Sequence, residues 1–121
     1  MTTALASFLP QLRKYPGIYV PRVTFLSVCS FVAGYRWGAD DETLGGFQAW
    51  MVKRVGTRPE LGWPWLVLCE IYPADQLPDP AGFSGEQDIE AIETLFDLLE
   101  AFYRESAVDD GRKLGQDDAP K

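Results

Sequence analysis

A chain of 121 residues with 46% hydrophobic residues is long enough for one domain with a buried core, which excludes wholesale disorder. Its formal net charge of −7 disfavours nucleic acid and anionic membranes and favours a basic partner. The chain has no histidine, which removes the commonest general base at neutral pH and the commonest zinc ligand. Cys29 and Cys69 are too few for a disulfide framework, so we expect two buried free thiols, no metal and no cofactor.

The charges are separated along the chain. Residues 1–65 contain seven Lys/Arg and four Asp/Glu, a balance of +3, whereas residues 66–121 contain four and fourteen, a balance of −10. Asymmetry of this size affects partner choice rather than fold. No apolar run reaches the roughly 20 residues of a membrane helix. Arg13 and Lys14 follow the first apolar residues, the reverse of a secretory signal, so we expect a cytoplasmic protein.

The first predicted helix has apolar residues at the spacing i, i+3, i+4 and i+7, namely Leu5, Phe8, Leu9 and Leu12. Pro10 fits this helix if the helix begins near Ser7, because proline is tolerated in a first turn. Tyr15-Pro16-Gly17 ends the helix. An extended segment, residues 18–20, then leads to the next one.

The next two segments also have helical spacing. Pro21 can open a second helix over about residues 22–37, with Gly38 as its stop. This helix is apolar on most sides and is therefore expected to be central. A third helix is indicated by apolar positions at helical spacing, namely Leu44, Phe47, Trp50, Met51 and Val55. Basic residues near its end complement the helix dipole, and Gly56 closes it.

The segment 63–72 combines a proline suited to a first helical turn with many strand-forming residues. We favour a short buried helix because no second strand is evident, and a short β element near 65–72 is the alternative. Residues 73–83 are rich in proline and are expected to form a loop.

The fifth helix has the clearest signals, since Ser84 and Gln87 fit a capping box. One apolar face is formed by Ile89, Ile92, Phe96, Leu99 and Tyr103. The predicted fold class is therefore all-α, a compact bundle of about five helices. Residues 1–105 form a single helical domain, and residues 106–121 form a disordered acidic tail.

Acidic residues form a stripe on the other side of the fifth helix. Projected at 100° per residue, five of them fall within a sector of about 80°: Glu86, Glu90, Glu93, Asp97 and Glu100. Such a stripe is commonly a solvated helix face. Because its like charges repel at i, i+3 and i+4, it also indicates a recognition surface, and we predict that it docks a partner. Asp40, Asp41 and Glu42 form a second predicted patch, which lacks the ligand spacing of a calcium loop.

No group of residues indicates catalysis. The serines have no histidine to activate them, and no G-x-S-x-G motif occurs. Gly45-Gly46 belongs to neither a phosphate-binding loop nor a dinucleotide fingerprint. The tryptophans are not interleaved with basic residues as in nucleic-acid readers, so we assign them to packing. We therefore expect no catalytic residues, no enzymatic activity and no nucleic-acid partner.

Four motifs resemble those of a known class of small bacterial proteins. They are K-Y-P-G-I-Y-V (14–20), F-V-A-G-Y-R (31–36), G-G-F-Q-A-W-M (45–51) and G-W-P-W-L-V-L (62–68). They resemble an R-P-G-M-Y-[IL]-G opening, an L-x-x-F-x-x-G-Y helix, a G-F-x-x-[WF]-[LV] helix and a G-W-x-x-[IL] segment. That class consists of helical immunity proteins encoded beside polymorphic toxins. Tyr15 replaces the usual arginine, and Pro21 stands where a glycine is frequent.

The resemblance implies an immunity protein that binds a cognate toxin and occludes its active site without chemistry of its own. It implies a basic toxin that acts in the cytosol, such as a nuclease or a deaminase, because an acidic helix can fill a basic cleft. The alternative is a generic adaptor or regulatory domain that binds a protein or small ligand through an aromatic pocket. In that case Tyr19, Tyr35 or Trp63 would carry the binding.

Overall fold

The structure is a computed structural model that describes the backbone of residues 4–38 and 43–118 and the side chains of residues 6–35 and 46–105. The helices in these ranges are α1 (Ala4–Lys14), α2 (Pro16–Tyr19), α3 (Phe25–Gly38), α4 (Thr43–Val55), α5 (Trp63–Leu68) and α6 (Gly85–Asp118). A short 3-10 turn, η1 (Pro80–Gly82), precedes α6. No strand occurs in these ranges, so the all-α prediction is confirmed.

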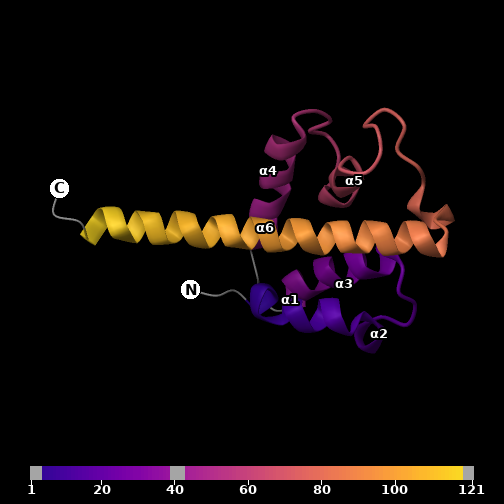
Figure 1. The fold of residues 1–121 in the computed structure, drawn as a ribbon, viewed down its shortest axis with the longest axis horizontal. Coiled ribbons are helices and arrows are strands. Elements are labelled where there is room, and N and C mark those ends of the chain that lie inside the picture. Colours follow the sequence, from indigo (N-terminus) through magenta and orange to yellow (C-terminus); the bar gives the residue numbers. More distant parts are fainter. Residues whose placement is uncertain (1–3, 39–42, 119–121) are drawn as a thin grey trace.

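The helix α6 is the central element of the bundle. It packs against four helices, with α4 and α5 on one side and α1 and α3 on the other (Figure 1). Its buried side chains therefore cover more than one face: Ala91, Ile92, Leu95, Phe96, Leu98, Leu99 and Phe102. The helix α3, expected to be central, packs against α1, α4, α6 and η1, but Leu26 on its remaining apolar surface is 42% exposed.

The first turn of α6 differs in phase from the predicted apolar face. Ile89, expected on that face, is 64% exposed, whereas Asp88 is buried. Asp88 lies four residues before Ile92 and so shares a helical stripe with core residues. Its carboxylate accepts a hydrogen bond from the Phe25 N–H at 2.9 Å, at the start of α3. A buried carboxylate is tolerated here because it satisfies a backbone donor at a helix N-terminus.

The start of α6 follows the predicted capping box. The Ser84 N–H donates to Gln87 Oε1 at 2.9 Å, and the Gln87 N–H donates to Ser84 Oγ at 3.2 Å. The helix continues to Asp118, and Figure 1 shows its last turns extending past the other helices. Disorder of residues 106–121 stays a prediction. Among the helices described, none is both long enough and apolar enough to span a membrane.

The N-terminal segment differs from the prediction in two ways. The helix α1 begins at Ala4, so Pro10 lies inside it rather than in its first turn. The lost backbone hydrogen bond is offset by tertiary packing, since Leu9 and Leu12 are buried in the core. Of residues 18–20, expected to be extended, only Val20 is extended, because residues 18 and 19 belong to the helical turn α2 (Pro16–Tyr19). Pro16 suits the first position of a helix because its φ is fixed near the helical value.

The helix α3 begins at Phe25, three residues later than predicted. Thr24 sets this start, because its Oγ1 accepts a hydrogen bond from the Ser27 N–H at 3.1 Å in the manner of an N-cap. The helix ends at Gly38 as expected. The predicted third helix is confirmed as α4, and Gly56 follows it with a φ of +77°, a conformation that glycine adopts without strain.

The ambiguous segment 63–72 begins with the helix α5 and continues as turns. The side chains Leu66, Val67 and Leu68 are buried, which accounts for the strand-like composition of this short helix. The helical alternative is therefore confirmed, and the short β element near 65–72 is wrong. The loop over 73–83 is also present and contains only η1.

Candidate functional site

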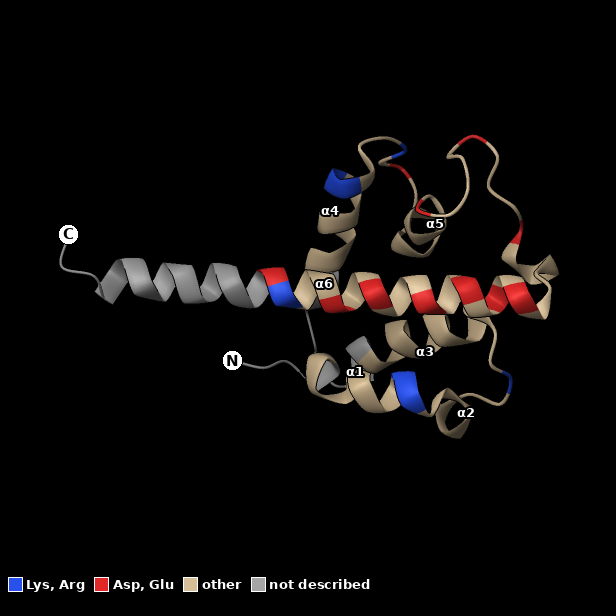
Figure 2. Ribbon diagram, viewed as in Figure 1, with Lys and Arg blue, Asp and Glu red and all other residues tan. Residues whose placement is uncertain are grey.

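Acidic residues follow the part of α6 whose side chains are described, and the basic end of α1 lies beside them (Figure 2). Arg13, in the last turn of α1, donates from Nη2 to Glu93 Oε2 at 3.1 Å and to Asp97 Oδ1 at 2.8 Å. Its Nη1 pairs with Glu100 Oε2 at 2.9 Å. The structure therefore brings three of the eight predicted docking residues around one cation. We call the five acidic residues of the stripe (Glu86, Glu90, Glu93, Asp97 and Glu100) the acidic face.

The electrostatics of Arg13 explain how α6 tolerates so many like charges. Burial alone would lower the pKa of its guanidinium, but hydrogen bonds to Asp97, Glu100 and Glu93 outweigh burial and raise that pKa. The guanidinium also lies over the Phe96 ring, 5.8 Å from its centroid. Arg13 thus remains charged at neutral pH and offsets the mutual repulsion of the three carboxylates.

The three carboxylates remain accessible although they are paired. Their side chains are 40% to 68% exposed, whereas the side chain of Arg13 is 25% exposed. Three negative charges and one positive charge leave this group with a charge of about −2. The arginine therefore positions the carboxylates without neutralising the surface.

The other predicted docking residues occupy different environments. Glu86 and Glu90 are exposed, and their carboxylates form no ion pair with the side chains that the structure describes. They therefore contribute unpaired negative charge to the N-terminal half of the acidic face. Asp40, Asp41 and Glu42 lie outside the described residues, so their role as a second patch stays a prediction.

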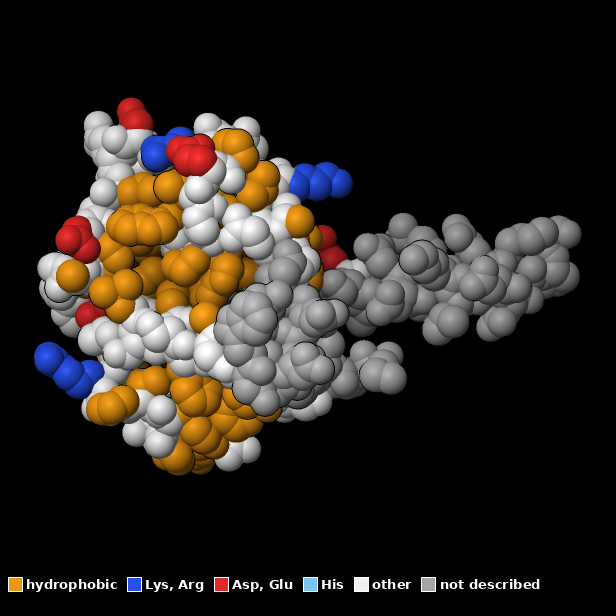
Figure 3. Space-filling model, turned by 180° about the vertical axis from the view of Figure 1, so that it is seen from behind, with side chains coloured by type: hydrophobic (Ala, Val, Ile, Leu, Met, Phe, Trp, Pro, Cys, Tyr) orange, Lys and Arg blue, Asp and Glu red, His pale blue; other side chains and the backbone are white. Residues whose placement is uncertain are grey.

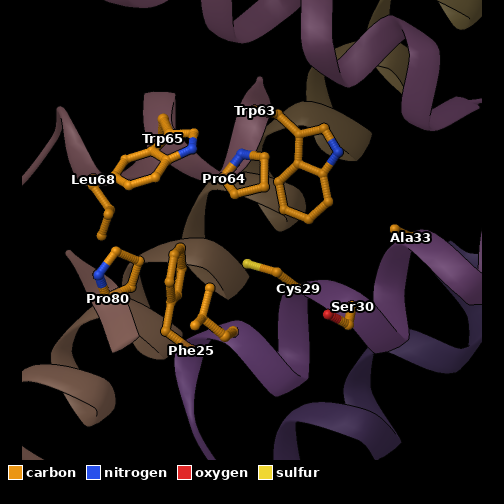
Figure 4. Close-up of a pocket in the computed structure, with 10 residues that line it drawn as sticks. Phe25, Cys29, Ser30, Ala33, Trp63, Pro64, Trp65, Leu68 and Pro80 are labelled. Carbon is orange, nitrogen blue, oxygen red and sulfur yellow. The ribbon is translucent and has the colours of Figure 1, made fainter. Parts of the chain in front are cut away.

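A second feature is an apolar slot between α3 and α5, which the sequence did not reveal. It encloses about 280 Å³ and is lined by Phe25, Leu26, Cys29, Ser30, Ala33, Trp63, Pro64, Trp65, Leu68 and Pro80. Figure 3, seen from behind, shows hydrophobic side chains gathered around a hollow. Figure 4 shows α3 side chains facing those of α5 across the slot. We call these ten residues the α3–α5 slot.

The ten described residues of the slot are all uncharged. Leu26 and Trp65 are 42% and 37% exposed, so apolar surface reaches solvent there. Figure 4 shows the Cys29 sulfur directed between the two rows of side chains. Burial raises the pKa of the Cys29 thiol well above its ordinary value. Because the thiolate is the nucleophilic form, Cys29 serves as an apolar lining residue of the slot. Cys69 is a free thiol that is only partly buried.

The three aromatic residues of the alternative hypothesis do not share one pocket. Tyr19 and Tyr35 pack against Phe8, with ring centroids 4.8 Å and 5.2 Å apart, in a cluster that joins α1, α2 and α3. Trp63 lines the α3–α5 slot and packs edge-on against Phe47 at 5.7 Å. Only the tryptophan of this set can contribute to ligand binding in the slot.

The burial of Asp88 and the pairing of Arg13 with the acidic face were not predicted, and they differ in whether the sequence indicates them. Asp88 could have been found, because an acidic residue four positions before Ile92 falls on the core stripe of α6. The pairing of Arg13 with the acidic face has no local signal in the sequence, since its partners are 80 or more residues away.

Among the described residues, no group of three or more histidine, cysteine, aspartate or glutamate side chains is arranged so that it could hold a metal ion. Searches of protein-family models, curated proteins and solved structures find no match to the chain.

Proposed function

We propose that this protein neutralises a cognate basic toxin by docking its acidic face on the toxin and occluding the active site. The observation that carries the proposal is the Arg13 cluster, in which one guanidinium pairs with three exposed carboxylates on one side of α6. The motifs that resemble immunity proteins support the same function. The partner class is a toxin with a basic substrate cleft, such as a nuclease or deaminase that acts in the cytosol.

Ordered carboxylates favour binding in two ways. The net charge of −7 attracts a basic partner over long distances and raises the association rate. At short range, side chains that Arg13 already holds lose less conformational entropy when a partner binds them. Glu86 and Glu90, which are exposed and unpaired among the described residues, then supply charges that the partner can pair directly.

Occlusion requires no chemistry from this chain. A toxin's lysine or arginine side chains that normally hold substrate would pair with the acidic face, and the bundle behind it would exclude the substrate. The protein therefore acts in this proposal without a catalytic residue, metal or cofactor. The second predicted patch, Asp40, Asp41 and Glu42, is proposed to add negative charge to the contact with the toxin.

The test is binding and protection against the toxin domain encoded beside the gene for this chain. Charge reversal of the two unpaired acidic-face residues, Glu86→Lys with Glu90→Lys, is compared with Glu60→Lys plus Asp75→Lys. Both double variants change the net charge from −7 to −3 and leave the Arg13 cluster intact. The control residues are exposed and lie outside α6.

We expect the acidic-face variant to bind the toxin domain on the order of 10-fold to 100-fold more weakly and to lose protection of growing cells. The control variant should stay within about threefold of the wild type, because it retains the local charges that contact the cleft. Equal affinities for the two variants would show that only net charge matters. Failure of the wild-type protein to bind or protect would refute the proposed function itself.

A further inference from the structure

The α3–α5 slot is walled by two opposing rows of side chains. One row comes from α3 and includes Phe25, Cys29 and Ala33, which recur every four residues on one helical face. The other row comes from α5 and consists of Trp63, Pro64, Trp65 and Leu68 (Figure 4). Pro80 of η1 completes the lining. Because three separate elements contribute, the slot is a property of the tertiary fold.

The walls are held in place by packing behind them. Phe25 and Leu68 are fully buried, and the Phe25 ring lies 6.3 Å from that of Phe83. Trp63 is fixed by its edge-on contact with Phe47. The slot therefore does not need to reorganise to receive a ligand, which lowers the free-energy cost of binding.

The chemistry of the walls restricts what can enter. None of the ten lining residues carries a charge, and Ser30 supplies the only hydroxyl. A charged group in the slot would lose hydration without gaining an ionic partner among these ten residues, which is costly. The rings of two tryptophans and two prolines give flat apolar surfaces that suit aromatic ligands. A volume of about 280 Å³ is at the lower end for ligand pockets and accommodates one or two rings.

We propose that the α3–α5 slot is a binding site for one small, uncharged molecule that carries one or two aromatic rings. The hydroxyl of Ser30 serves a single polar group on that molecule. This site is separate from the acidic face and does not depend on the proposed toxin neutralisation.

The binding test uses 2-naphthol as the probe and the full-length protein. Titration is followed by NMR through the indole N–H signals, with Trp63 and Trp65 as reporters. Trp50 is the internal control, because it lies outside the slot and its Nε1 donates to Glu105 Oε1 at 3.0 Å. We expect saturable 1:1 binding with a Kd below about 1 mM, with shifts of the Trp63 and Trp65 signals and none of the Trp50 signal.

Two charged analogues test the chemistry of the site. In 2-naphthoate and 2-naphthylmethylammonium the ring system is kept and a negative or positive charge is added. We expect each to bind at least about tenfold more weakly than 2-naphthol, because none of the ten described lining residues offers a compensating charge. Equal affinity of 2-naphthol and both charged analogues would show surface adsorption and would overturn the proposal.

A pair of matched variants locates the site. Ala33→Phe fills the slot from the α3 side, whereas Ala49→Phe makes the same change on the exposed surface of α4. Ala33→Phe should abolish the 2-naphthol shifts, and Ala49→Phe should bind like the wild type. If Ala33→Phe does not fold, as judged by circular dichroism, Ser30→Leu at the edge of the slot replaces it. No saturable binding by the wild type, or full binding by a folded slot-filled variant, overturns the proposal.

Discussion

The acidic face and the α3–α5 slot represent two different ways of leaving a surface available for binding. On the acidic face, one cation from α1 orders three carboxylates that remain 40% to 68% exposed. In the slot, apolar side chains of α3 and α5 face each other without closing the gap. Charge acts over distance and controls association, whereas apolar surface acts on contact and controls affinity. A chain of this size thus presents surfaces suited to different classes of ligand.

The largest expected loss of stability follows from substituting Phe25, a buried residue that lines the slot. Phe25→Ala removes a fully buried ring and should lower the free energy of unfolding by about 3 to 5 kcal/mol. Leu26→Ala, one residue further along, removes a side chain that is 42% exposed and should cost less than about 1.5 kcal/mol. Urea denaturation of both variants measures the difference. Equal losses would show that the slot is not open at Leu26.

The next largest effect concerns the contact between α6 and the start of α3. Asp88→Ala leaves the Phe25 N–H without its acceptor and should cost about 1 to 3 kcal/mol of unfolding free energy. Asp88→Asn keeps a carbonyl acceptor and should recover part of that loss. Chemical denaturation of the two variants provides the measurement. If both were as stable as the wild type, Asp88 would not be a structural carboxylate.

A smaller effect is expected where the acidic face meets α1. Arg13→Met keeps much of the apolar stem but removes the cation from three carboxylates, and it should cost about 1 to 2 kcal/mol at low salt. Added NaCl screens the repulsion that remains, so the difference from the wild type should shrink near 1 M salt. Thermal unfolding at two salt concentrations checks this. A salt-independent loss would point to packing rather than charge.

The smallest effect is expected for an ion pair between α4 and the turn after α5. Arg54 Nε lies 3.2 Å from Glu70 Oε1, and this single pair links α4 to the turn after α5. Glu70→Gln should lower the unfolding free energy by less than about 1 kcal/mol, because one partly exposed pair contributes little. Comparison with Arg13→Met in the same buffer ranks the two electrostatic contacts. A larger loss for Glu70→Gln would reverse the ranking.

Local signals predicted the helices better than they predicted the surfaces. The capping box of Ser84 and Gln87 and the glycine after α4 are short-range features, and both were confirmed. The predicted start of α1 near Ser7 was wrong, because tertiary packing offsets the backbone hydrogen bond that Pro10 removes inside the helix. The apolar character of α3 was evident, but its incomplete coverage depends on where α5 and η1 lie. The spacing of residues within α3 does not indicate where α5 and η1 pack.

The acidic face shows the same limit. The positions of its five carboxylates on one side of α6 follow from helical periodicity. The arrival of Arg13 among them does not, because it depends on how α1 packs against α6. Such long-range contacts decide whether a stripe of charge is merely solvated or is held in an ordered arrangement.

The most direct test of the proposed function is cross-saturation NMR on a complex with the toxin domain that the proposal expects to be encoded beside the gene. Docking through the acidic face predicts that amide signals of Glu86, Glu90 and Glu93 lose intensity. Under the same conditions, the amide signals of Leu26 and Trp65 at the slot should be unchanged. A footprint on the slot that leaves α6 unaffected would contradict docking through the acidic face.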